Sequence, residues 1–142
     1  NYLGSLYTIG RGVPQDYVQA VSWYRKGAEL GDANAQALLG GMYIKGEGVA
    51  QDGKQAFSWF SKAAKQGDVR AQTLLGLMYG EGIGIPRDYS LAYVWLSVAA
   101  ANGDIEANES RDSAAKKLSQ PQLEAAQEVA AIYLENSKNQ LK

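Results

Sequence analysis

The sequence predicts an all-α fold in which short helices form antiparallel pairs that stack as a solenoid. One observation is a strict internal period, because the three tryptophans, Trp23, Trp59 and Trp95, are each 36 residues from the next. Another is that a glycine-rich turn separates two apolar stripes at helical spacing within each period. A single unit of this kind cannot bury its own stripes, so neighbouring units must stack around a shared core.

The period places all 142 residues in a single array. We expect a truncated unit at 1–32, complete units at 33–68 and 69–104, and a C-terminal capping unit at 105–137. In this register Asn1 aligns with Ala37, which lies inside a predicted helix. The chain is therefore expected to be a fragment or a trimmed product of a longer protein.

The first helix of the second unit is predicted to follow Asp32, whose carboxylate can accept from a backbone N–H at a helix start. The segment 46–48 ends this helix, because glycine tolerates the left-handed conformation of a helix exit. Gly48 is the repeated position within that turn. The apolar stripe of the helix consists of Ala35, Leu38, Leu39, Met42 and Tyr43.

The second helix of this unit is expected to begin after Asp52 and to end at Gly67. Its small residues leave room for a neighbouring helix, and Trp59 is predicted to fill the space between units. Burial of one such aromatic side chain contributes about 2–3 kcal/mol. The stripe of this helix consists of Ala56, Trp59, Phe60, Ala63 and Ala64.

The same structural positions recur in the other units, whereas the last unit departs from them. After Asp104 the glycine turn is missing, and Ser119 and Gln122 are placed to form a capping box for a final helix. Such an atypical terminal unit is expected to show a more polar outer face. The residues assigned structural roles are Trp23, Trp59, Trp95, Tyr43, Tyr79, Gly48, Gly84, Asp52 and Asp88.

Composition argues against several classes of function. The chain has neither histidine nor cysteine, which removes imidazole bases, thiolate nucleophiles and the usual zinc ligand sets, so no cofactor or metal is expected. A net charge of −1 gives no reason to expect a nucleic-acid partner. The longest apolar run, 94–101, is far shorter than the roughly 20 residues of a membrane span, so direct membrane insertion is not expected.

The most specific pattern lies in the second unit, in Leu39, Gly40, Tyr43, Gly46, Gly48, Asp52, Ala56, Trp59, Phe60, Ala63, Ala64, Gly67 and Asp68. This pattern resembles the tetratricopeptide repeat, but its period is longer and its turn richer in glycine. The combination is similar to Sel1-like repeats. That resemblance implies a right-handed superhelical solenoid and a non-catalytic adaptor role in a bacterium, with export weakly favoured. The absence of cysteine separates this chain from the cysteine-rich bacterial branch, so any hydrolase activity of that branch is not carried over.

By similarity to tetratricopeptide arrays, first-helix positions outside the apolar stripe are expected to line a concave face that binds a protein or peptide. The candidate partner-binding residues are Asn34, Ala37, Gly41, Ile44, Lys45, Arg70, Thr73, Leu77, Glu81, Glu106 and Glu109. The same face is expected to include Ser5, Thr8, Ile9, Gly80, Ser113, Lys116 and Lys117.

Two alternatives remain open at this stage. One is an enzyme or accessory protein that acts on cell-wall glycan or peptidoglycan, for which Glu106 and Glu109 are the only close carboxylate candidates. Such chemistry needs two carboxylates about 5–10 Å apart in a cleft, whereas a solvated helix face is the simpler interpretation. The other is a purely structural spacer between further domains of a longer protein.

Overall fold

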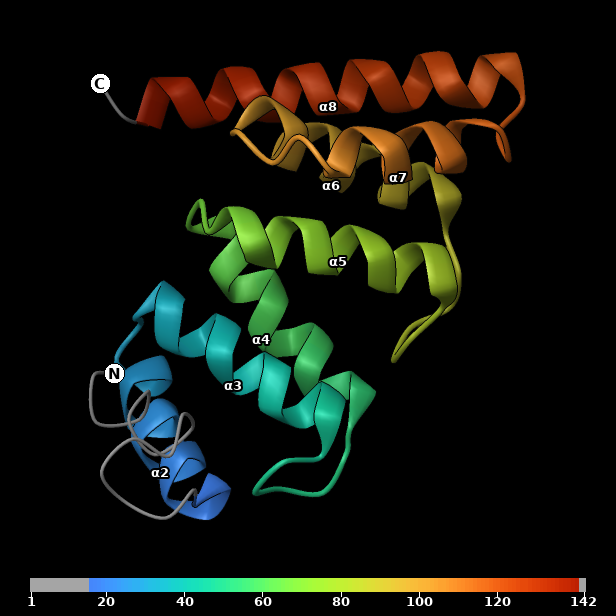
Figure 1. The fold of residues 1–142 in the computed structure, drawn as a ribbon. Coiled ribbons are helices and arrows are strands. Elements are labelled where there is room, and N and C mark those ends of the chain that lie inside the picture. The colour runs from blue at the N-terminus through green and yellow to red at the C-terminus, as the bar shows by residue number, and fades with distance from the viewer. Residues whose placement is uncertain (1–15, 141–142) are drawn as a thin grey trace. The chain divides into compact units, whose positions relative to one another are not determined.

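A computed structural model describes the backbone of residues 16–140 and the side chains of residues 16–138 (Figure 1). Within that span every regular element is an α-helix. The predicted truncated first helix of the first unit, and the concave-face positions in it, lie outside the described residues. The helices are α2 (Tyr17–Glu29), α3 (Ala33–Lys45), α4 (Gly53–Lys65), α5 (Val69–Glu81), α6 (Tyr89–Ala101), α7 (Ala107–Ala115) and α8 (Gln120–Gln140).

The helix starts reproduce the period of the sequence. Helices α2, α4 and α6 begin at Tyr17, Gly53 and Tyr89, and α3 and α5 begin at Ala33 and Val69, so equivalent helices start 36 residues apart. Each of these five helices is 13 residues long. The prediction of an all-α array of helix pairs with a 36-residue repeat is therefore confirmed.

The chain divides into two compact units, 1–71 and 72–142. In the first, α3 packs against both α2 and α4. Its largest fully buried side chains are Tyr24, Leu39 and Phe60, each no more than 1% exposed. In the second, α6 packs against α7 and α8, and Leu75, Leu96 and Val98 are the comparable buried residues.

Aspartate side chains begin the repeated helices, as the sequence predicts. The carboxylate of Asp52 accepts from the backbone N–H groups of Lys54 and Gln55 at 3.0 and 3.2 Å. Asp88 accepts from the N–H of Leu91 at 3.0 Å. These bonds satisfy donors that a helix start otherwise leaves without partners.

The start of α7 is different. Asp104, which continues the aspartate series, does not cap α7 with its carboxylate; instead it accepts from the Thr73 hydroxyl at 2.5 Å. The residue before α7, Glu106, makes no side-chain capping bond. Helix α8, by contrast, has the predicted capping box, in which the Ser119 N–H donates to Gln122 Oε1 at 2.9 Å and the Gln122 N–H donates to Ser119 Oγ at 3.3 Å.

The glycine turns have the expected left-handed backbone. Gly48 and Gly84 both have φ of +75°. Each turn is closed by a bond between its first helix and the next capping residue, from the Asp52 N–H to Tyr43 O at 3.0 Å and from the Asp88 N–H to Tyr79 O at 2.9 Å. The repeated tyrosines are thus joined to the repeated aspartates by the backbone, which fixes the entry to each second helix.

The tryptophans are less deeply buried than the sequence suggests. Trp95 is 8% exposed, Trp59 is half-buried, and Trp23 is 36% exposed. The next residue in each helix is the more buried one, and Phe60 is only 1% exposed. The Lys62 ammonium instead lies 4.5 Å from the centroid of the Trp59 ring, in a cation–π contact. Phe60 therefore fills the centre of the α3–α4 pair within one unit, whereas the sequence analysis placed Trp59 in the space between units.

Candidate functional site

The second unit contains a pocket of about 220 Å³ between α5, α6 and α7. Its position matters because α5 and α7 are the first helices of two successive repeats, and α6 lies between them in the chain. The pocket is lined by Gly76, Leu77, Gly80, Glu81, Tyr89, Ala92, Leu96, Ser110, Ser113, Ala114 and Lys117.

Two glycines of α5 determine the space in the pocket. A Cβ atom on Gly76 would lie 2.7 Å from Leu96 Cγ, so α5 and α6 are in direct contact there. A Cβ atom on Gly80, one turn further along, would meet only the Ala92 methyl group at 3.7 Å. The helices thus pack tightly at Gly76, while the absence of a side chain at Gly80 leaves room.

The walls of the pocket occupy equivalent positions in successive repeats. Leu77 and Glu81 on α5 are each 36 residues before Ser113 on α7 and Lys117 in the turn that follows α7. The floor from Ala92 and Leu96 is apolar and buried, whereas Glu81 and Lys117 at the rim are exposed. No ion pair joins these two charges in the part of the chain that the structure describes. The pocket therefore combines an apolar floor with one acidic and one basic rim residue.

The predicted concave-face residues fall into distinct groups. Leu77 and Glu81, together with Gly80, Ser113 and Lys117 of the same predicted face, line the pocket. On the first turns of α5, Arg70 is exposed, while Thr73 is bonded to Asp104. In the first unit Asn34 and Lys45 are exposed, and Gly41 and Ile44 are half-buried.

Ala37 does not lie on an exposed face, although the sequence analysis included it among the partner-binding residues. Its side chain is only 3% exposed, so it belongs to the core and cannot offer a contact surface. The reason is that α3 packs against both α2 and α4, which buries Ala35, Gln36 and Ala37 in succession. A first helix that is covered on two sides has a narrower free face than the sequence pattern alone indicates.

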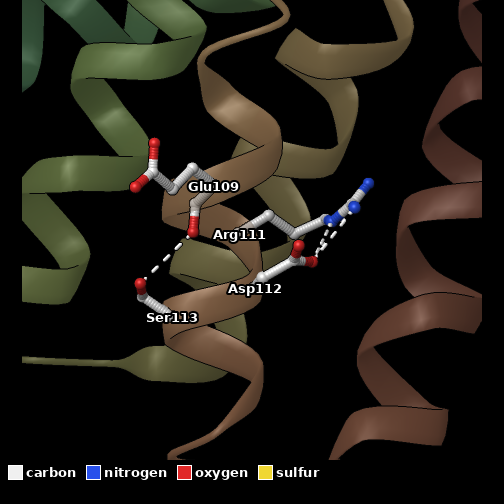
Figure 2. A network of polar contacts seen from close by, with 4 residues as sticks. All are labelled: Glu109, Arg111, Asp112 and Ser113. Atoms are coloured by element: carbon white, nitrogen blue, oxygen red, sulfur yellow. Dashed lines mark hydrogen bonds and ion pairs between the residues drawn. The ribbon is translucent and has the colours of Figure 1, made fainter.

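The two glutamates of the enzyme alternative lie at the start of α7, outside the pocket lining, with Glu106 just before the helix and Glu109 in its first turn. Both Glu106 and Glu109 are exposed. In Figure 2 the Glu109 carboxylate points away from its neighbours Arg111 and Asp112, which pair with each other at 3.1 Å. The backbone oxygen of Glu109 accepts from the Ser113 hydroxyl at 3.2 Å. No observation places the two carboxylates in a common cleft.

The sequence analysis did not identify a buried glutamine that recurs in two repeats and forms hydrogen bonds inside the core. Gln36 and Gln72 are 4% and 1% exposed, although glutamine is normally a surface residue. Gln36 Nε2 donates to Ala28 O at 3.1 Å, and Gln66 Nε2 donates to Gln36 Oε1 at 2.8 Å. In the next repeat, Asn102 Nδ2 donates to Gln72 Oε1 at 3.1 Å. The available signal was the 36-residue step from Gln36 to Gln72.

Neither a membrane span nor a metal cluster is found among the described residues. No helix within 16–140 is both long and apolar enough to cross a bilayer. The described side chains form no group of three or more aspartate or glutamate residues able to hold a metal ion.

Comparison with known repeats decides the family. The sequence model of the Sel1 repeat matches residues 1–32, 33–68 and 69–104. The chain belongs to the Sel1 repeat family. Sel1 repeat proteins are generally protein-interaction scaffolds and are typically non-catalytic. No curated protein matches the sequence.

Three solved bacterial structures are similar to this Sel1 array. A Sel1 repeat protein from Oxalobacter formigenes is 38% identical with a TM-score of 0.75, over 78% of this chain and 45% of that chain. A protective antigen with an SLR fold, present in uropathogenic Escherichia coli strains, is 34% identical with a TM-score of 0.68, over 94% and 37% of the two chains. This Sel1 chain therefore spans less than half the length of either.

The third structure is the Helicobacter pylori cysteine-rich protein B. It is 21% identical with a TM-score of 0.65, over 76% of this chain and 88% of that chain. At that identity the match supports the solenoid fold of the Sel1 array alone. The cysteines that give this neighbour its name have no counterpart here, because the present chain contains none.

Proposed function

We propose that this Sel1 array is a non-catalytic scaffold that binds a polypeptide segment on its first-helix face. The observation that carries the proposal is the pocket between α5 and α7, because residues from two successive repeats line it. Leu77 and Glu81, which the sequence places on the partner-binding face, are among its lining residues. Solenoids commonly use the surface formed by successive repeats to bind their partners.

The size and lining of the pocket favour one apolar side chain as the group that enters it. A volume of about 220 Å³ is below the roughly 300–1,000 Å³ of typical small-molecule sites. The apolar floor from Ala92 and Leu96 suits an aliphatic or small aromatic side chain. At the rim, Glu81 and Lys117 are available to a basic and an acidic residue that flank this anchor.

The test uses a random peptide library selected against the purified chain, followed by titration of the recovered peptides. We expect recovered peptides to share an apolar anchor with a charged neighbour. Gly80→Leu should weaken their binding by about tenfold or more, because the new side chain fills the pocket. Gly80→Ala is the matched control, since its Cβ atom finds ordinary contact distance to Ala92 and leaves most of the volume free.

Helical content and urea melts of both variants separate a filled pocket from a damaged fold. Equal binding by the wild type and a well-folded Gly80→Leu variant would exclude this pocket. Failure to recover any binding peptide would count against the proposal that this face binds a linear polypeptide segment.

A further inference from the structure

Helix α8 exposes an apolar stripe along one side. Val129 and Ile132 are 49% and 54% exposed, and Ala125 is exposed beside them. Their spacing of four and then three residues places all three on one side of the helix. The expectation of a more polar outer face for the last unit is therefore not met along this side.

The stripe is separate from the face that holds α8 in place. Ala126 and Ala130 are 3% and 5% exposed and form a buried cluster with Val94 of α6. Tyr133 packs edge-on against Trp95 with ring centroids 4.9 Å apart. These contacts anchor α8 to α6 (Figure 1). Val129 and Ile132 are thus free to contact another molecule while the anchoring face remains packed.

Acidic residues border the stripe on the side away from the core. Glu128 lies one turn from both Ala125 and Ile132, and Glu135 lies one turn beyond Ile132. Both are exposed, as is Glu124 one turn earlier. Within α8 the first basic residue is Lys138, near its end. The stripe is therefore apolar along its centre and negatively charged along its solvent-facing edge.

The acidic edge beside the apolar stripe favours some binding partners over others. A second copy of α8 would bring a row of glutamates to the same contact, and like charges across a helix pair are unfavourable. A helix with an apolar stripe and a row of lysines or arginines along one edge would match both features. Such a helix buries its apolar face on Val129 and Ile132 and pairs its basic edge with Glu128 and Glu135.

We propose that the exposed face of α8, Ala125, Val129 and Ile132 with Glu128 and Glu135, is a second docking surface, which binds an amphipathic helical segment with a basic edge. This surface uses none of the residues that line the α5–α7 pocket. It does not depend on the function proposed for that pocket.

The test titrates the full chain with two synthetic helical peptides of about 20 residues, long enough for helix formation. They share one leucine stripe and differ only in having lysine or glutamate along one edge. Fluorescence anisotropy should give a Kd about tenfold or more lower for the lysine peptide, with binding that weakens as salt is added. Val129→Ala with Ile132→Ala should weaken binding of the lysine peptide by about tenfold or more while keeping the helix, because alanine is the best helix former.

Two further variants make the test specific. Ile105→Ala is the control for exposed apolar residues in general, because Ile105 is 81% exposed on the turn before α7 and should not affect binding. Glu128→Gln with Glu135→Gln should remove most of the salt dependence. The proposal is overturned if neither peptide binds, if both bind equally, or if the alanine double variant binds as well as the wild type. It also fails if sedimentation shows a dimer that the alanine variant abolishes.

Discussion

Gly40 lies directly against the ring of Phe60, and this contact sets the spacing of α3 and α4. A Cβ atom on Gly40 would stand 2.9 Å from Phe60 Cε1, closer than side-chain carbons pack in proteins. The same relationship recurs one repeat later between Gly76 and Leu96, where the distance would be 2.7 Å. A glycine on each first helix thus receives a large buried side chain from the second helix.

The first prediction is that Gly40→Ala destabilises the fold although alanine favours helices. Phe60 is only 1% exposed, and its ring must shift to admit the added methyl group, which should cost about 1–3 kcal/mol, as overpacking does. Gly41→Ala is the control, because no atom lies within 4 Å of its Cβ position, and it should stabilise by up to about 1 kcal/mol. Urea unfolding of both variants measures the difference. Equal stability of Gly40→Ala and wild type would contradict the close contact.

The second prediction concerns the turn at Gly48. Its φ of +75° strains any other residue, and a Cβ atom there would lie 2.2 Å from Tyr17 O, a backbone atom that cannot rotate away. Gly48→Val should therefore lower the stability by more than the roughly 1–3 kcal/mol of backbone strain alone. Gly31→Ala isolates the strain, because Gly31 has φ of +94° but nothing within 4 Å. Thermal melts should rank Gly48→Val well below Gly31→Ala; similar losses would exclude the Tyr17 clash.

The third prediction compares two neighbouring aromatic residues. Phe60→Ala should cost roughly 3–5 kcal/mol, the usual range for a buried phenylalanine. Trp59→Ala should cost less than Phe60→Ala, because Trp59 is only half-buried, but more than the roughly 0.5 kcal/mol of ordinary surface substitutions. Urea melts of the two single variants provide the ranking. A larger loss for Trp59→Ala would restore Trp59 as the central core residue.

Sequence periodicity predicted the repeat, the aspartate caps and the glycine turns, because each depends on local backbone chemistry. Depth of burial depends on how far neighbouring helices close over a side chain. Tryptophan recurs unchanged at 23, 59 and 95, whereas the position of Phe60 varies to Tyr24 and Leu96, yet the varied position is the more deeply buried one. Strictness of the period therefore does not report depth of burial. The pocket was partly predictable, since Leu77 and Glu81 lie on the expected face. Its existence also requires the space left at Gly80, which only the packing of α5 on α6 reveals.

The fourth prediction is that Gln36 stabilises the fold through its two hydrogen bonds. Ala28 O also accepts from the Gly31 N–H at 3.0 Å, so removing Gln36 costs the two side-chain bonds themselves, each worth about 0.5–1.5 kcal/mol. Gln36→Ala should therefore be clearly destabilising. A double-mutant cycle with Gln66→Ala should give a coupling of about 0.5–1.5 kcal/mol for their mutual bond. Strict additivity of the two single changes would show that this bond contributes nothing.

The last prediction separates the two apolar residues of the proposed partner-binding face. Leu77 lines the pocket, whereas Ile44, on the first helix of the preceding repeat, is half-buried and does not. Leu77→Asp should reduce peptide binding by about tenfold or more, because a carboxylate then faces the apolar floor. Ile44→Asp should have a smaller effect, and the double variant should resemble Leu77→Asp. Titration with library-selected peptides, alongside thermal melts that confirm folding, measures this order. Full binding by a folded double variant would instead direct the search to the second-helix face around Lys54, Ser58, Lys62 and Lys65.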